Sequence, residues 1–163
     1  DDDVSLTQTA SLALNDSGHY ENRWATLEFN SESSCVWTKD LERIRVPVRH
    51  GEGKFVVANV ELMDHWDHSG QIVVRYVDPN STYPSSSDKL LPYPISPNAS
   101  MRNIAGVCDP TGRVFGLMPH PEANHSTWLG ATWTRELTAS EHGEGEGLAI
   151  FRNAVDYVEK NLK

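Results

Sequence analysis

The stretch VFGLMPHPEANH, residues 114–125, carries more information about fold and chemistry than any other part of the chain. Its apolar first half is typical of a buried strand, which ends at Pro119. Pro119 and Pro121 fix their own φ and bias their neighbours toward extended backbone, so His120 is expected at a rigid strand end. In extended backbone, residues i and i+2 point to the same side, so Glu122 should reach His120. An imidazole oriented by a carboxylate can act as a general base, although a rigid loop with a surface histidine would also fit this spacing.

The segments around this stretch alternate between strand and helix patterns. Strands are expected at 23–29, at 44–48 with an interruption at Pro47, at 71–77, and in a hairpin of 104–108 with 113–118 across a Pro/Gly turn. Residues 55–66 continue apolar into a short helix, while 78–100 and 123–145 are expected to be polar loops. The terminal segment predicts an amphipathic helix whose apolar stripe is Leu148, Phe151, Val155, Val158 and Leu162. Strands mixed with helices indicate an α/β fold, expected as one domain over residues 1–163.

Composition limits the function classes. The 163 residues carry a formal charge of −9, which argues against a nucleic-acid partner because phosphate binding needs clustered Lys and Arg. No stretch approaches the roughly 18 apolar residues of a membrane span, and the three leading aspartates are unlike a signal peptide. With only two cysteines, a reducing compartment is the default, so a cytoplasmic protein is expected. Four N-x-S/T sequons, at Asn15, Asn80, Asn98 and Asn124, are therefore interpreted as chance.

Three other groups of residues could carry chemistry. His50 and Glu52 lie in a glycine-rich turn that suits either close approach to a ligand or simply exposed charges. The DHWDH segment at 64–68 could place metal ligands on one helix face, but a solvated helix end before Gly70 is the favoured interpretation. Cys35 and Cys108 could each be a nucleophile, although either could equally be a small buried apolar residue.

Five ordered segments together resemble one family. They are NDSGHYENRW at 15–24, PVRHGEGKF at 47–55, RYVD at 75–78, the YP, SPNAS and IAG groups between 93 and 106, and LMPHPE at 117–122. They are similar to N-x-S-G-R-F-E-x-R-W, P-V-x-H-G-E-G-[KR]-F, R-Y-V-D, Y-P-x-N-P-N-G-S…I-A-G and the family's triad segment. The family is the glutaminase part of phosphoribosylformylglycinamidine synthase, among the class I (triad) glutamine amidotransferases. The resemblance covers nearly the whole chain from about residue 12.

The resemblance implies a flavodoxin-like, doubly wound fold and a mechanism. A cysteine thiolate attacks the carboxamide of glutamine, His120 moves protons and Glu122 holds His120. The segment containing Val48, Arg49 and His50 resembles the one whose backbone helps to hold glutamine. Ammonia then passes to a synthetase subunit or domain that uses ATP and Mg²⁺ in purine biosynthesis. The resemblance implies neither a cofactor nor a metal in this chain.

The sequence departs from the family at the nucleophile. It has no G-x-C-N-G-x-Q turn, and neither Cys35 nor Cys108 lies in a matching segment. The chain is therefore expected to be the C-terminal portion of the domain, without its first strands and nucleophile elbow, and to need a cysteine-bearing N-terminal segment as partner. A non-catalytic relative that docks on a synthetase or binds glutamine is the alternative. A metal-dependent hydrolase using His50, His65, His68 and His120 is a third hypothesis. Ser96, Ala99 and His19 replace the family's Asn, Gly and Arg, which affects only fine substrate contacts.

Overall fold

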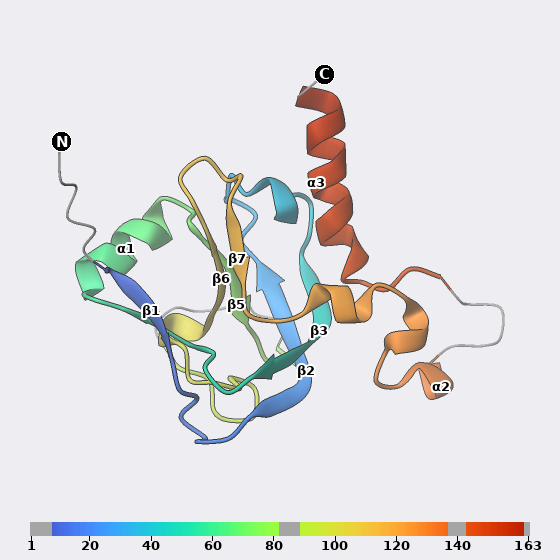
Figure 1. Ribbon diagram of the computed structural model, residues 1–163, viewed down its shortest axis with the longest axis horizontal. Helices are drawn as coiled ribbons and strands as arrows, with labels where there is room; N and C mark the ends of the chain where they lie inside the picture. Colours follow the sequence, from blue (N-terminus) through green and yellow to red (C-terminus); the bar gives the residue numbers. More distant parts are fainter. Residues whose placement is uncertain (1–7, 82–88, 137–142, 162–163) are drawn as a thin grey trace.

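The computed structural model describes residues 8–81, 89–136 and 143–161 and contains a curled five-stranded sheet, in the order β3-β2-β5-β6-β7 (Figure 1). Its strands are β2 (Glu21–Phe29), β3 (Arg43–His50), β5 (Ile72–Tyr76), β6 (Ile104–Cys108) and β7 (Phe115–Leu117). A separate antiparallel pair joins β1 (Ala10–Ala13) to β4 (Lys54–Val57). All the pairings within the described residues are antiparallel.

The predicted strands are all present, but the expected interruption at Pro47 is wrong. β3 runs through Pro47, which lies opposite Trp24 of β2. A proline lacks the N–H that a central strand would need, but β3 is an edge strand of this sheet, so no ladder bond is lost on its outer side. The predicted hairpin of β6 and β7 is confirmed, and its turn closes through the Gly112 N–H, which donates to the Asp109 carbonyl over 3.0 Å.

The helices are α1 (Val60–His68), α2 (Trp133–Glu136) and α3 (Leu148–Asn161). Short 3₁₀ turns are η1 (Val36–Thr38), η2 (Met101–Asn103), η3 (Pro121–Asn124) and η4 (Thr127–Leu129). The loop expected over 123–145 thus contains two 3₁₀ turns and α2, with 137–142 outside the described residues. Part of the loop expected over 78–100, residues 82–88, also lies outside them. Within the described ranges, no helix has the length and apolarity needed to cross a bilayer.

The predicted terminal helix is confirmed, but the face that it buries is not the predicted one. Ile150 is buried, whereas Phe151, Val155 and Val158 of the expected stripe are exposed. Leu148 of that stripe is half-buried, and Leu162 lies outside the described residues. α3 contacts η1 more than any other element, and the Asn153 amide donates to the carbonyls of Trp37 and Lys39. Because α3 packs through its first turns against this loop and rises past the sheet (Figure 1), the apolar stripe has no described surface to cover.

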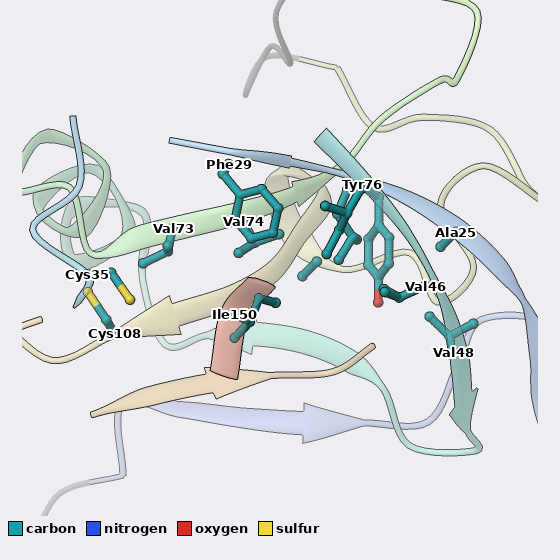
Figure 2. Close-up of a cluster of buried hydrophobic side chains, with 13 residues drawn as sticks. Ala25, Phe29, Cys35, Val46, Val48, Val73, Val74, Tyr76, Cys108 and Ile150 are labelled. Carbon is teal, nitrogen blue, oxygen red and sulfur yellow. The ribbon is translucent and has the colours of Figure 1, made fainter. Parts of the chain in front are cut away.

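Two hydrophobic clusters hold the elements together. The larger lies between the curled sheet and α3, and Figure 2 shows its side chains, among them Val46, Val48, Val74, Tyr76 and Ile150. A smaller cluster, Val57, Met63, Ile72 and Ile104, lies under α1. Burying a side chain of this size stabilises a fold by about 1.5–3 kcal/mol. The chain is therefore an α/β protein whose sheet edge at β3 is held rigidly by core residues of the same strand.

Candidate active site

His120 and Glu122 form the pair that their spacing predicted. Nδ1 of His120 lies 2.6 Å from Oε1 of Glu122. An ionised carboxylate only accepts hydrogen bonds, so Nδ1 carries the proton and Nε2 of the neutral ring is left with a free lone pair. The two side chains are 37% and 58% exposed, so a reactant can reach Nε2. The arrangement is that of a general base with an orienting carboxylate.

The backbone beneath the pair is not the extended segment that was expected. His120 lies between β7 and η3 with φ −106° and ψ 84°, and Glu122 belongs to the 3₁₀ turn. The reason is Pro121, whose fixed φ suits the first position of a helical turn as well as a strand end. Glu122 therefore reaches Nδ1 because the chain turns at His120, and not because of strand alternation.

Two hydrogen bonds seat this turn on the outer edge of β3, and a third joins Glu146 to the same edge. The His120 N–H donates to the Pro47 carbonyl over 2.8 Å, and the Asn124 amide donates to the Arg45 carbonyl over 2.7 Å. The Arg45 N–H in turn donates to Oε2 of Glu146 over 2.7 Å. The pair is thus fixed to a strand end that is anchored in the core.

The glycines of the Gly/Glu alternation allow the chain to pass closely behind the pair. The N–H of Gly147 donates to the Asn124 carbonyl over 3.0 Å. A Cβ added to Gly147 would lie 2.0 Å from the Pro121 carbonyl oxygen, and one added to Gly145 would lie 2.3 Å from that of Asn124. Any larger residue at either position would push on the turn that carries Glu122.

The three residues predicted to hold glutamine lie on this same edge strand, but with different orientations. Val48 and His50 are buried, with their side chains in the core, and Arg49 is exposed. Burial lowers the pKa of His50, against the opposing effect of the Glu21 carboxylate. Val48 and His50 pair with Arg23 and Glu21 of β2, so their backbone groups turn toward that strand, whereas Arg49 has both its backbone groups and its side chain on the outer edge.

Neither cysteine resembles an activated nucleophile. Cys35 and Cys108 are buried in the larger core cluster, side by side in Figure 2. Burial raises the pKa of both thiols, that of Cys108 to about 11. Reactive cysteines have lowered pKa values and some exposure, so these two are core residues.

The possible metal ligands of the DHWDH segment are engaged elsewhere. Asp67 pairs with Arg75 and Arg102, and Asp64 also pairs with Arg102. Within the part of the chain that the structure describes, no cluster of three or more His, Cys, Asp or Glu side chains could hold a metal ion. The described residues therefore offer no ligand set for the metal-hydrolase hypothesis.

Sequence reasoning missed three asparagines that shape the site. Asn15, Asn98 and Asn124 were taken as chance sequons, yet all three are buried and their amide nitrogens donate hydrogen bonds. A buried, donating amide is not available for glycosylation in this fold. A signal existed for two of them, because Asn15 and Asn98 lie in family-like segments.

The structure thus brings a histidine and an orienting carboxylate together beside an edge strand of an α/β fold, an arrangement found in several classes of enzyme that use a triad. Comparison with known proteins agrees. The family model described as "CobB/CobQ-like glutamine amidotransferase domain" matches residues 1–158, so the chain belongs to this family.

Individual relatives within this family are also similar to the chain over most of its length. The chain is 39% identical to phosphoribosylformylglycinamidine synthase subunit PurQ of Archaeoglobus fulgidus, over 98% of the chain and 56% of the relative. It is also 39% identical to the subunit of the same name from Treponema denticola, over 97% and 56%. The solved structure of PurLQS from Thermotoga maritima superposes with a TM-score of 0.58 and 26% identity, covering 94% of this chain and 55% of that one. The chain spans about half the length of the curated relatives it matches.

Proposed function

We propose that this chain carries the base and the orienting carboxylate of a glutaminase that supplies ammonia for formylglycinamidine ribonucleotide synthesis in purine biosynthesis. The observation that supports this most directly is the 2.6 Å bond between His120 and Glu122, which orients an exposed imidazole and leaves its Nε2 as the nitrogen that can accept a proton. The names of the relatives support the choice of pathway.

In this mechanism Nε2 of His120 takes the proton of a cysteine thiol on another segment, and the thiolate adds to the side-chain carbonyl carbon of glutamine. The same nitrogen gives the proton to the departing amide nitrogen, so ammonia leaves and a glutamyl thioester remains. Water then adds to the thioester while Nε2 takes its proton, and Nε2 returns that proton to the departing sulfur, which releases glutamate and restores the thiol. Glu122 stabilises the imidazolium that forms in each half of the cycle.

Glutamine would be held by the outer edge of β3 beside His120. In an antiparallel ladder, alternate residues turn both backbone groups away from the partner strand. Arg45 and Pro47 do so, since their outward groups bond to Asn124, Glu146 and His120. Arg49 is next in this alternation and is exposed, so its N–H and C=O are placed to bind the polar main-chain groups of glutamine.

The proposed partners are a cysteine-bearing segment and a synthetase. An open, mostly apolar groove of about 260 Å³, formed by Leu12, Phe55, Gly116 and Leu117 among others, runs along β6 and β7. β7 leads directly to His120, so a segment packed in this groove would lie close to the base. The synthetase partner is supported by the PurLQS structure and by the names of the relatives. Its use of ATP and Mg²⁺ is what the family resemblance implies.

The test is His120→Ala in the assembled enzyme. Glutamine-dependent synthesis should fall by about 10³-fold or more, because the residual rate of a triad enzyme without its base is very low. Synthesis from added ammonia should persist. His65→Ala, an exposed histidine on α1, is the matched control and should leave both activities intact. Equal loss of both activities in His120→Ala would show damage to the structure instead of the triad.

A second function is favoured by one observation: both cysteines of the chain are buried, with raised pKa values. A binding module would take up glutamine or a synthetase without chemistry. Titration calorimetry with glutamine, followed by an assay for released ammonia, separates the two functions. Binding without any ammonia release by the assembled protein would favour the module.

A further inference from the structure

Asn15 ties the first loop of the described chain to the turn between β3 and β4. Its amide nitrogen donates to the carbonyl of His50 over 2.7 Å, and its amide oxygen accepts from the Gly53 N–H over 3.1 Å. Its own backbone N–H donates to the Gly51 carbonyl over 2.9 Å. Asn15 is 3% exposed, so these bonds are shielded from water. One buried side chain therefore sets the backbone of the turn that directly follows Arg49.

Asn98 holds the same turn from the other side. Its amide nitrogen donates to the Gly53 carbonyl over 2.7 Å and to the Tyr76 hydroxyl over 3.2 Å, and it lies 3.4 Å from Nε2 of His50. Its amide oxygen accepts from the Ser100 hydroxyl over 2.8 Å and from the Ser100 N–H over 3.1 Å. Asn98 is 1% exposed. The turn is thus clamped between two buried amides that come from distant parts of the sequence.

The two amides also decide the protonation of His50. Oδ1 of Asn15 is an acceptor, so Nδ1 of His50, 3.0 Å away, must be the donor. Nε2 faces the amide nitrogen of Asn98, which can only donate and also serves the Gly53 carbonyl and the Tyr76 hydroxyl, so a proton on Nε2 would face a donor. Only one neutral tautomer satisfies both neighbours, because a protonated ring would set a donor against a donor. Burial, which lowers the pKa of His50, agrees with this geometry.

We infer that Asn15 and Asn98 are positioning residues, which hold the turn between β3 and β4 so that the Arg49 backbone presents its hydrogen-bonding groups beside His120. The inference rests on the proposed function, since it assigns these residues to the glutamine-binding edge of the same site. Neither residue touches the reacting atoms, and each acts through the backbone that it fixes. The turn packs tightly against the His50 ring, because a Cβ added to Gly53 would lie 2.4 Å from it.

The test compares Asn15→Ala and Asn98→Ala with Asn153→Ala in the assembled enzyme. Asn153 is the matched control, because its amide also bridges two backbone carbonyls, those of Trp37 and Lys39, but joins α3 to η1 and not to β3. The KM for glutamine should rise about ten- to hundredfold in the two test variants, with a smaller change in kcat, because a misplaced binding edge weakens ground-state and transition-state binding alike. Asn153→Ala should leave KM within about twofold of wild type.

A second variant, Asn15→Asp, keeps acceptors for His50 and Gly53 but loses the donor to the His50 carbonyl and adds a negative charge. Nitrogen NMR of the ring should show a single neutral tautomer for wild-type His50 and a raised pKa in Asn15→Asp. An unchanged pKa of His50 and an unchanged KM in this variant would overturn the inference even if Asn15→Ala fails to fold.

The outcomes separate the inference from the function on which it rests. If the wild-type assembly is active but Asn15→Ala and Asn153→Ala shift KM equally, the inference fails and the function stands. If the wild-type assembly does not use glutamine, the proposed function fails. Amide hydrogen exchange at Gly51 and Gly53 then tests the positioning role of the two asparagines. Faster exchange in Asn15→Ala and Asn98→Ala, but not in Asn153→Ala, retains that role, and unchanged exchange removes it.

Discussion

Gly147→Ala should damage both stability and catalysis, although Gly147 touches no reacting atom. The new Cβ would lie 2.0 Å from the Pro121 carbonyl oxygen, 2.8 Å from the Pro121 carbonyl carbon and 3.0 Å from the Asn124 carbonyl oxygen. Atoms of this kind do not approach closer than about 3 Å, so the turn or η3 must shift by about 1 Å. All three contacts are backbone atoms, which cannot rotate away as a side chain would. Overpacking of this kind costs about 1–3 kcal/mol.

The displaced segment lies between the base and its carboxylate, because Pro121 joins His120 to Glu122. A shift of about 1 Å in a catalytic group can lower the rate by about 10²-fold. Urea unfolding of the chain measures the stability loss, and glutamine-dependent turnover of the assembly measures the catalytic loss. Gly143→Ala is the matched control from the same turn, since no atom lies within 4 Å of its added Cβ. Gly147→Ala with a free energy of unfolding within about 0.5 kcal/mol of Gly143→Ala would refute this reasoning.

Three further outcomes follow from the geometry. Glu122→Gln keeps an acceptor near His120 but removes the charge that stabilises the imidazolium. The kcat for glutamine should therefore fall about 10²–10⁴-fold while ammonia-dependent synthesis persists. Loss of both activities would contradict the role of Glu122 as the orienting carboxylate. Cys35 and Cys108 should react with a thiol reagent only on unfolding, because both are buried and burial raises the pKa of Cys108 to about 11; rapid labelling of the native protein would disprove their burial. Burial lowers the pKa of His50 below its ordinary value of 6.5, so the unfolded chain binds that proton first as the pH falls. The stability that this residue contributes should therefore be complete above pH 6.5 and decline below it. Urea midpoints of wild type and of His50→Asn at several pH values measure this contribution. Identical pH dependence in the two proteins would exclude the effect.

Local patterns predicted most elements correctly and failed where packing decided the outcome. The hairpin of β6 and β7 was foreseen because its turn residues and its apolar runs are neighbours in sequence. The break at Pro47 was wrong, since whether a strand tolerates proline depends on its place in the sheet. The buried face of α3 was also wrong, because periodicity identifies an apolar stripe but not the surface against which the helix packs.

The candidate site also contains features that local patterns predicted and features that they did not. The spacing of His120 and Glu122 predicted their contact, but the 3₁₀ turn that makes it was not foreseen. Asn15, Asn98 and Asn124 were overlooked because their partners are far away in sequence: His50 is 35 positions from Asn15 and 48 from Asn98, and Arg45 is 79 from Asn124. Hydrogen bonds at such separations leave no periodic trace.

The sequence by itself determined the strands of the five-stranded sheet, the terminal helix, the His120–Glu122 pair and the family, because each depends on residues that are close together or on ordered motifs. Only the tertiary structure decided that the pair sits on the edge of β3, that the His50 side chain turns into the core, and that two distant asparagines clamp the turn after Arg49. The physical reason is that the backbone edge of a strand and the protonation of a buried ring are set by neighbours brought from elsewhere in the chain, and folding alone chooses those neighbours.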